Sequence, residues 1–394
     1  MNNIVYLNLE YLKSRSDITG SITVHNVHAL KNELNNEIKK QTDSSVIDLL
    51  VIDMYNTQAK YSDDIVAKES NLYNLFKDVE SNDSIDNILF VNHFNDPLTD
   101  NFLIDKDFPE SKKVFVTTFV RKDNNKDDFD DVTIRQSKNV PDSALKEIND
   151  KVFGPNSMTV HKEKYLQFIG NLVSNRIKTL LLNNKCIENI NKEDHILSST
   201  PVHVNKYVNL KPILEEHDCF NEMCCLLYHQ IDRICGTPDF VVASSRNSIY
   251  IASGLLKYFN SKNDTTNMII IDQISPVTRL TNFSNLNDIK PNRKYAIIED
   301  FCCMGTEIKI VKSVLWSRGV DVDSEKFPIY TFPIVSSNLY GNNTTTEFQM
   351  RKIHPLHILD NSDESENYLM FTSSCCPECN GIDCKHRKDF NFKK

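Results

Sequence analysis

The stretch YAIIEDFCCMGT, residues 295–306, decides the fold of the C-terminal half of this chain. Its apolar start is typical of a buried strand in a parallel sheet. Two adjacent acids, Glu299 and Asp300, end the apolar run, and a turn with Gly305 opens a helical pattern over residues 307–317. The order predicts a strand, an acidic pair, a tight turn and a helix.

This order places two acids directly before the start of a helix. Free N–H groups at a helix N-terminus, together with the helix dipole, bind anions. A carboxylate pair beside such an anion site suits a ligand with hydroxyls next to a phosphate, as in a ribose 5-phosphate group. The alternative is that Glu299 and Asp300 only cap the helix. Because ionised carboxylates resist burial, two acids ending an apolar strand would be a costly cap, so we expect a ligand site.

The sequence around this stretch predicts a second α/β unit from about residue 196. Strand-like and helix-like patterns alternate there, which indicates a parallel sheet flanked by helices. The predicted strands are residues 240–243, 268–272, 295–298 and 329–335. The predicted helices are residues 213–234, 248–259 and 307–317.

Over roughly residues 201–337 the sequence resembles the type I phosphoribosyltransferase family. That family's fingerprint is a strand, two acids, a short loop with a glycine, and a helix, as in residues 295–306. Residues 242–248 (VASSRNS) resemble its pyrophosphate loop, and residues 275–291 its mobile loop. Residues 203–212 (HVNKYVNLKP) resemble the lead-in of orotate-type members.

The resemblance implies an Mg²⁺-dependent glycosyltransferase that binds phosphoribosyl pyrophosphate or a nucleotide, transfers a phosphoribosyl group and releases pyrophosphate. Glu299 and Asp300 would hold the ribose hydroxyls. The residues that would hold the 5-phosphate are Cys302, Cys303, Met304, Gly305 and Thr306. The residues that would meet the Mg²⁺-bound pyrophosphate are Ser245, Arg246 and Asn247. The residues implied in catalysis are Arg246, Asp300 and Arg279, with electrostatic stabilisation as the main effect.

Departures from the family pattern keep other hypotheses open. Met304 stands where the family has threonine, Glu307 where it has threonine or serine, and Ser248 where glycine is common. Glu307 would repel a phosphate. The loop EDFCCMGTE looks closer to a divergent subgroup of bacterial conflict or defence systems. The second hypothesis is a catalytically silent sensor or regulator that uses the same pocket within a defence-type assembly. A zinc-stabilised interaction protein with a vestigial pocket is the third.

A cluster of soft ligands lies near the end of the chain. Its members are Cys376, Cys379, Cys384 and His386. A Cys-x2-Cys pair supplies two thiolates of a tetrahedral Zn²⁺ site, and a nearby Cys/His pair can complete it, which predicts a structural Zn²⁺. Free thiols on a tail, or a knuckle-like contact to single-stranded nucleic acid, are the alternatives.

The length of 394 residues predicts two or three domains, because single cores rarely exceed about 250–300 residues. We expect an N-terminal α/β, flavodoxin-like domain over residues 1–140 and a helical linker over 141–195. The phosphoribosyltransferase-like domain would cover 196–345, and a Cys/His segment 346–394. In the first domain the patterns predict strands at residues 4–9, 22–25, 46–54, 87–93 and 113–120, a helix at 27–40, and a loop over 122–140.

Composition and charge argue against several classes of protein. A net charge of −9 argues against a surface for duplex nucleic acid. No apolar run approaches the ~20 residues of a membrane span, and the first residues lack a secretory signal, so we expect a cytoplasmic protein. The 11 cysteines are then expected to be reduced. A homo-oligomer is compatible with this composition.

Overall fold

The structure of the chain is a computed structural model. It describes residues 4–16, 27–41, 47–54, 85, 87–91, 113–120, 131–138, 140–155, 159–189, 196–197, 202–260, 265–274, 279–284, 288–303, 305–337, 352–359 and 363–372. The chain divides into two compact units, Met1–Leu172 and Val173–Lys394.

Unit 1 contains one mixed sheet with helices. The sheet order is β1 (Ile4–Asn8), β2 (Leu49–Asp53), β3 (Asn87–Val91), β4 (Lys113–Val120), β5 (Asp131–Gln136) and β6 (Thr159–His161). Strands β1 to β4 pair in parallel, and β5 and β6 add antiparallel strands. The helices are α1 (Leu9–Arg15), α2 (Val27–Gln41) and α5 (Asp142–Phe153). Strands β2 and β3 are buried along their whole length, as in a sheet with both faces covered.

Two expectations for unit 1 need revision. Strand β5 lies inside residues 122–140, which were expected to form a loop. Its Val132 and Ile134 are buried and alternate with more exposed positions, which is the period of a half-buried strand. The flavodoxin-like arrangement is not confirmed: the described strands follow chain order, with β1 at one edge, whereas a flavodoxin-like sheet has its first strand inside. The strand expected at residues 22–25 lies outside the described residues.

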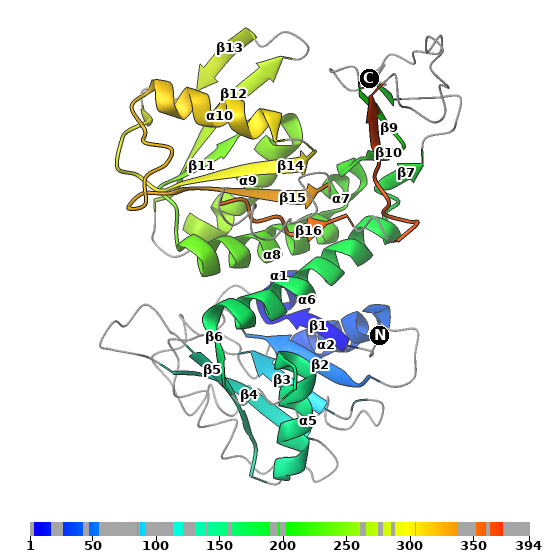
Figure 1. Cartoon of the computed structure of the whole chain (residues 1–394). Coiled ribbons are helices and arrows are strands. Elements are labelled where there is room, and N and C mark those ends of the chain that lie inside the picture. The colour runs from blue at the N-terminus through cyan, green and yellow to red at the C-terminus, as the bar shows by residue number, and fades with distance from the viewer. Residues whose placement is uncertain are drawn as a thin grey trace. The chain divides into compact units, whose positions relative to one another are not determined.

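Unit 2 is built on a second six-stranded sheet. Its order is β13 (Arg279–Ser284), β12 (Asn267–Ile274), β11 (Phe240–Ala243), β14 (Tyr295–Cys302), β15 (Ile329–Ser336) and β16 (His357–Ile358). All neighbours pair in parallel except β13, which is antiparallel to β12. The smaller strands are β7 (Ile187–Asn189), β8 (Ile196–Leu197), β9 (Val202–Val204), β10 (Lys206–Val208) and β17 (Met370–Thr372). The predicted parallel-rich α/β unit is confirmed (Figure 1).

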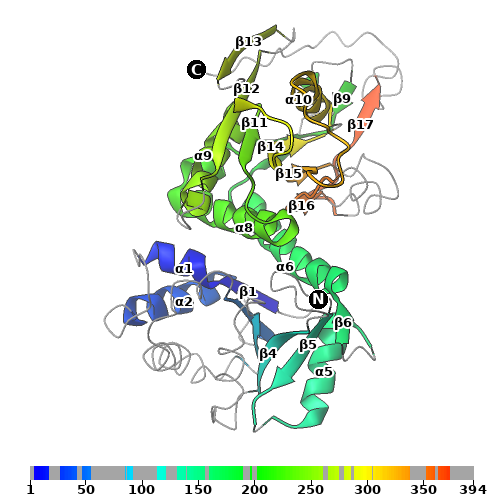
Figure 2. The ribbon, with the colours of Figure 1, turned by 90° about the vertical axis from the view of Figure 1, so that its left-hand side faces the viewer.

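Helices cover both faces of this sheet. They are α7 (Lys211–Glu215), α8 (His217–Cys235), α9 (Arg246–Phe259) and α10 (Thr306–Ser317), and α6 (Lys162–Asn183) crosses from unit 1 into unit 2. Figure 2 shows α8 and α9 on the side of the sheet opposite α10. Helix α10 packs Val311, Val314 and Leu315 into a cluster with sheet residues such as Ile297. Burial of such side chains is the main stabilising contribution.

Helices α8 and α9 approach closely at Gly254. A Cβ added there would lie 2.7 Å from Cζ of Phe220 and 2.8 Å from the sulfur of Cys224. Those distances are shorter than van der Waals contact, so even alanine would force the side chains of Phe220 and Cys224 to shift. Glycine at this position therefore lets these two side chains of α8 pack directly on α9.

Three boundaries in unit 2 differ from the sequence expectation. Strand β14 runs on through both acids to Cys302, because its edge keeps pairing with β15, for example Glu299 with Pro333. Strand β13 occupies part of the stretch expected to be a mobile loop. The helix expected at residues 213–234 is two helices, separated at Glu216, whose carboxylate accepts the backbone N–H of Cys219 at 2.6 Å.

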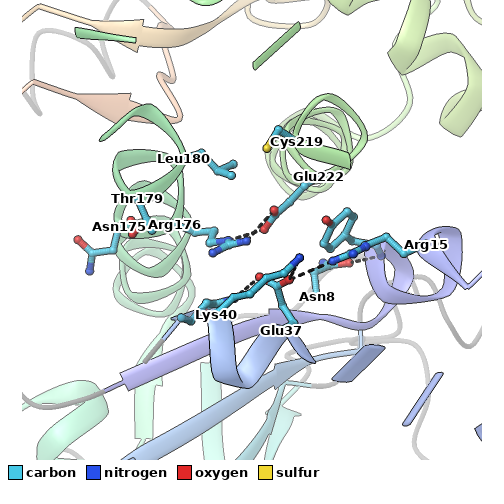
Figure 3. Close-up of polar contacts among 12 residues, drawn as sticks. Asn8, Arg15, Glu37, Lys40, Asn175, Arg176, Thr179, Leu180, Cys219 and Glu222 are labelled. Atoms are coloured by element: carbon cyan, nitrogen blue, oxygen red, sulfur yellow. Dashed lines mark hydrogen bonds and ion pairs between the residues drawn. The ribbon is translucent and has the colours of Figure 1, made fainter. Parts of the chain in front are cut away.

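Buried ion pairs tie helices together within each unit (Figure 3). In unit 2, Arg176 of α6 donates through Nε and Nη2 to the two carboxylate oxygens of Glu222 on α8, with 2.7 Å for the Nη2 bond. Both side chains are less than one-tenth exposed. In unit 1, Arg15 of α1 pairs with Glu37 of α2 at 3.2 Å. None of the helices in the described residues is long and apolar enough to cross a membrane.

The Arg176–Glu222 pair yields a stability prediction. Arg176→Met removes the guanidinium that compensates the buried Glu222 carboxylate, so we expect a loss of about 3–5 kcal/mol in the free energy of unfolding. The double variant Arg176→Met/Glu222→Met also removes the carboxylate charge and is expected to regain most of the lost stability. Urea denaturation of both variants measures this, and a double variant no more stable than the single one would contradict the account.

Candidate functional site

The parallel pairing of β11 with β14 creates the candidate site. Their register runs from Phe240 opposite Tyr295 to Ala243 opposite Ile298. The next residues along the chain are Ser244, which follows β11, and Glu299 of β14. They therefore lie side by side at the same edge of the sheet. Ligands of open α/β sheets bind at this carboxyl edge. The pairing brings together the two segments that the sequence singled out.

The two acids contact different parts of the turn after β11. Successive strand residues point to opposite faces. The Ser244 hydroxyl donates to Oε1 of Glu299 at 2.9 Å. The Ser245 hydroxyl donates to Oδ1 of Asp300 at 3.2 Å, and the Asn247 amide donates to its Oδ2 at 2.8 Å. The structure thus joins the predicted ribose acids to the predicted pyrophosphate loop by direct hydrogen bonds.

The turn before α9 is held by Ser248, which the sequence marked only as a departure from glycine. Its hydroxyl oxygen accepts the backbone N–H groups of Ser244 and Ser245, at 3.1 and 2.8 Å. Ser245 is the N-cap of α9, and its side chain accepts the N–H of Ser248 at 3.0 Å. This capping box fixes the turn that carries the acid contacts. Arg246, the first residue of α9, is exposed.

The start of α10 has the features of an anion site. Gly305 is its N-cap with φ 66°, a left-handed conformation that glycine adopts without strain, and no side chain caps the first N–H groups. The loop before it is fixed by Ser337, whose N–H and hydroxyl donate to the carbonyls of Cys302 and Cys303 at 3.0 and 2.8 Å. Met304 lies outside the described residues.

The two cysteines of this loop are thiols rather than thiolates. Cys302 is 3% exposed, and burial raises its pKa to about 12. Burial also raises the pKa of Cys303, whose sulfur lies 3.7 Å from the Tyr368 hydroxyl. Because the thiolate is the nucleophile, neither cysteine suits nucleophilic catalysis.

A third acid, Glu307, joins the pair from the first turn of α10. Glu299 is 1% exposed, and burial raises its pKa well above the usual value, with further contributions from the charges of Glu307 and Asp300. Glu307 is exposed as a residue. Partial loss of water around its carboxyl, and then the charge of Asp300, raise its pKa. Both groups therefore favour protonation more than ordinary carboxyls do.

Sequence reasoning missed two residues of the site. Ser244, inside the quoted loop, had no role assigned, although its hydroxyl contacts Glu299. The second residue is Tyr207 of β10. Burial is the main cause that raises the pKa of Tyr207, and the charge of the nearby Asp300 is the next. Tyr207 lies in the lead-in segment, so the order of segments was a usable signal for it.

A hollow of about 390 Å³ lies along α10, and we call it the α10 hollow. The side chains and backbone that line it belong to Gly305, Ile308, Lys309, Lys312, Val322, Asp323, Glu325, Ile329, Lys352 and Ile353. Glu299 and Asp300 are not among these residues. The hollow borders the predicted phosphate loop only at Gly305, so it is a separate feature from the acid contacts.

The remaining predicted residues are not brought to this site by the described structure. Arg279 starts β13, on the outer side of β12, and its side chain is not described. The cluster of Cys376, Cys379, Cys384 and His386 lies outside the described residues. Within the described residues there is no group of three or more His, Cys, Asp or Glu side chains that could hold a metal ion.

Comparison with known proteins gives structural likenesses only. No protein-family model and no curated protein matches the chain. The orotate phosphoribosyltransferase of Aeropyrum pernix is 12% identical, covering 46% of this chain and 93% of its own, with a TM-score of 0.35. The adenine phosphoribosyltransferase of Thermoanaerobacter pseudethanolicus is 11% identical, covering 39% of this chain and 88% of its own, with a TM-score of 0.31. The UMP synthase of Leishmania donovani is 11% identical, covering 90% of this chain and 83% of its own, with a TM-score of 0.36. Scores this low do not assign the chain to a family.

The raised pKa of Glu299 gives a pH prediction. A folded-state pKa above the unfolded value, near 4.5, means that the folded protein holds a proton that the unfolded chain releases. The stability that this bound proton contributes is fully present below about pH 4.5, and it is lost as the pH rises through the pKa of Glu299 in the folded protein. Glu299→Gln, neutral throughout, is therefore expected to gain stability relative to the unsubstituted protein between pH 5 and pH 8.

Melting temperatures of the two proteins at pH 5 and pH 8 test this prediction. Glu147→Gln removes an exposed carboxylate in unit 1 and serves as the control, with a difference that should not change with pH. A melting-temperature difference for Glu299→Gln that is the same at both pH values would show that Glu299 titrates normally.

Proposed function

We propose that unit 2 binds phosphoribosyl pyrophosphate, or a nucleotide, and transfers the phosphoribosyl group with release of pyrophosphate. The observation that carries the proposal is the hydrogen-bonded junction between Asp300 and the turn residues Ser245 and Asn247, beside the uncapped start of α10. In the proposed complex, these carboxylates would accept sugar hydroxyls and the N–H groups would bind a phosphate.

The ribose would be held by the acidic pair. Each carboxylate oxygen of Asp300 accepts one bond from the protein and keeps a lone pair for a ligand hydroxyl. On Glu299, Oε1 accepts from Ser244, whereas the buried Oε2 has no hydrogen-bond partner. A buried polar atom without a partner is rare, and a ribose hydroxyl would satisfy it.

The two phosphate ends would lie at two helix starts. The 5-phosphate would accept N–H groups of residues 302–306 and the first turn of α10. The pyrophosphate would lie at the turn before α9, where Arg246 is exposed and free of ion pairs with described residues. Mg²⁺, when bound, neutralises charge on the pyrophosphate. Since no described cluster could hold the ion alone, it would arrive with the ligand.

The chemistry would be mainly electrostatic. The bond from the anomeric carbon to the pyrophosphate oxygen breaks, and the pyrophosphate leaves with the electron pair. The acceptor forms the new bond to that carbon and loses a proton. Arg246 would stabilise the charge that develops on the leaving oxygen. Asp300 would fix the ribose and favour positive charge on the ring.

Calorimetry with phosphoribosyl pyrophosphate and Mg²⁺ tests the proposal. We expect binding and slow release of pyrophosphate, and loss of binding in Asp300→Asn because one of the two acceptor oxygens becomes an amide nitrogen, which cannot accept a ribose hydroxyl. The control Asp142→Asn changes an exposed side chain of unit 1 and should bind normally. Arg246→Met is expected to slow pyrophosphate release by about 10²-fold or more. Binding without release would indicate a sensor, and no binding would refute the proposal.

We also propose a structural Zn²⁺ held by Cys376, Cys379, Cys384 and His386, on the basis of their spacing alone. Metal analysis of the purified protein is expected to find zinc, and Cys379→Ser should reduce its content. Zinc content equal in the variant and the unsubstituted protein would contradict this assignment.

A further inference from the structure

Ser174 of α6 differs from three other helical residues in the partner of its hydroxyl. The hydroxyls of Thr179, Ser253 and Ser313 each donate to the backbone carbonyl four residues earlier, a common arrangement for serine and threonine within a helix. The Ser174 oxygen instead lies 2.8 Å from Nδ1 of His357 on β16, 183 residues away in the chain. This contact is therefore made by the tertiary fold and not by the helix.

The other ring nitrogen of His357 contacts a buried carboxylate. Nε2 lies 2.8 Å from Oε1 of Glu366, and the two side chains are 5% and 0% exposed. A neutral imidazole carries its hydrogen on the nitrogen that faces a carboxylate, so Nδ1 is left to accept the Ser174 hydroxyl. Lys178 lies 3.2 Å from Oε2 of Glu366, and its positive charge favours the ionised carboxylate.

The three side chains are arranged as a nucleophile, a base and a carboxylate that orients the base. These two hydrogen bonds identify a serine that is activated for covalent catalysis, whatever its place in the sequence. His357 and Glu366 are buried, whereas Ser174 is partly exposed, so the hydroxyl end of the chain is the end that a substrate can reach. None of these residues takes part in the proposed phosphoribosyl transfer, so the arrangement is independent of it.

We propose that Ser174 is a nucleophile for acyl transfer, activated by His357 and Glu366, and that its substrate is a small carboxylic ester. The Ser174 oxygen attacks the carbonyl carbon while its proton moves to Nδ1 of His357. The bond from that carbon to the leaving oxygen then breaks, and the leaving oxygen takes the proton. Water, activated by the same nitrogen, releases the acid and restores the serine. Glu366 stays ionised and stabilises the imidazolium.

Lys178 supplies the charge that stabilises the oxyanion of the tetrahedral intermediate. It follows Ser174 by four residues on α6, and residues with this spacing lie on the same face of a helix. Among the described residues its ammonium donates to Asp363 at 2.7 Å and to Glu366 at 3.2 Å, which leaves one of its three N–H groups for a ligand. Because the backbone N–H groups near Ser174 belong to the helix, this side chain replaces the backbone donors of other oxyanion sites.

A fluorophosphonate probe tests the proposal, because an activated serine displaces its fluoride and keeps the phosphorus on the serine oxygen. Mass spectrometry of the labelled protein is expected to find the probe on Ser174, and Ser174→Ala should abolish this labelling. His357→Gln removes the base and should slow it by about 10²-fold or more. The matched control Ser253→Ala removes another helical hydroxyl and should be labelled like the unsubstituted protein.

A purely structural role for these hydrogen bonds predicts a different result. No probe on Ser174 of the folded protein would overturn the proposal, and so would a rate that is unchanged in folded His357→Gln. A comparison within the unsubstituted protein needs no variant to fold: labelling of Ser174 should greatly exceed that of Ser253. Equal labelling of the two serines would show that the Ser174 hydroxyl is not activated.

Discussion

The parallel register between β11 and β14 is the constraint on which the site depends. It fixes Ser244 beside Glu299 and lets Ser245 and Asn247 reach Asp300. The helices then follow from the strands: α9 begins at the turn after β11, and α10 at the turn after β14. Two helix starts and two carboxylates converge at one sheet edge, because parallel strands end together there. A slip of one residue in this register would turn the acids to the wrong faces.

The sequence predicted the four central strands of this sheet, β12, β11, β14 and β15, because they are apolar runs. FVVA, MIII and YAII are typical of buried strands, and the helices between them carry apolar faces. Strand β5 escaped prediction because its alternating Val132 and Ile134 stand in an otherwise charged stretch. The extension of β14 through Glu299 and Asp300 was missed for a related reason: polar residues at a strand's end resemble a loop, and only pairing with β15 shows otherwise.

Side-chain partners were harder to predict than elements. The sequence named the acids and the turn, but not which hydroxyl meets which carboxylate. Ser248 looked like a loss relative to glycine, yet it braces the turn by accepting two backbone N–H groups. Glu307 looked like a simple repulsive charge. In the structure, loss of water and then the charge of Asp300 raise the pKa of its carboxyl, an effect that depends on the neighbouring strand and that no local pattern encodes.

The central claim is that sugar hydroxyls and a phosphate are held together between the acidic pair and the start of α10. A crystal structure of the protein grown with ribose 5-phosphate at pH 5 tests it most directly. The account predicts ribose hydroxyls hydrogen-bonded to Glu299 and Asp300, and the phosphate on the N–H groups of residues 302–308. Density for the ligand in the α10 hollow, against Lys309 and Lys312, with the acidic pair still bonded only to its own turn, would contradict it.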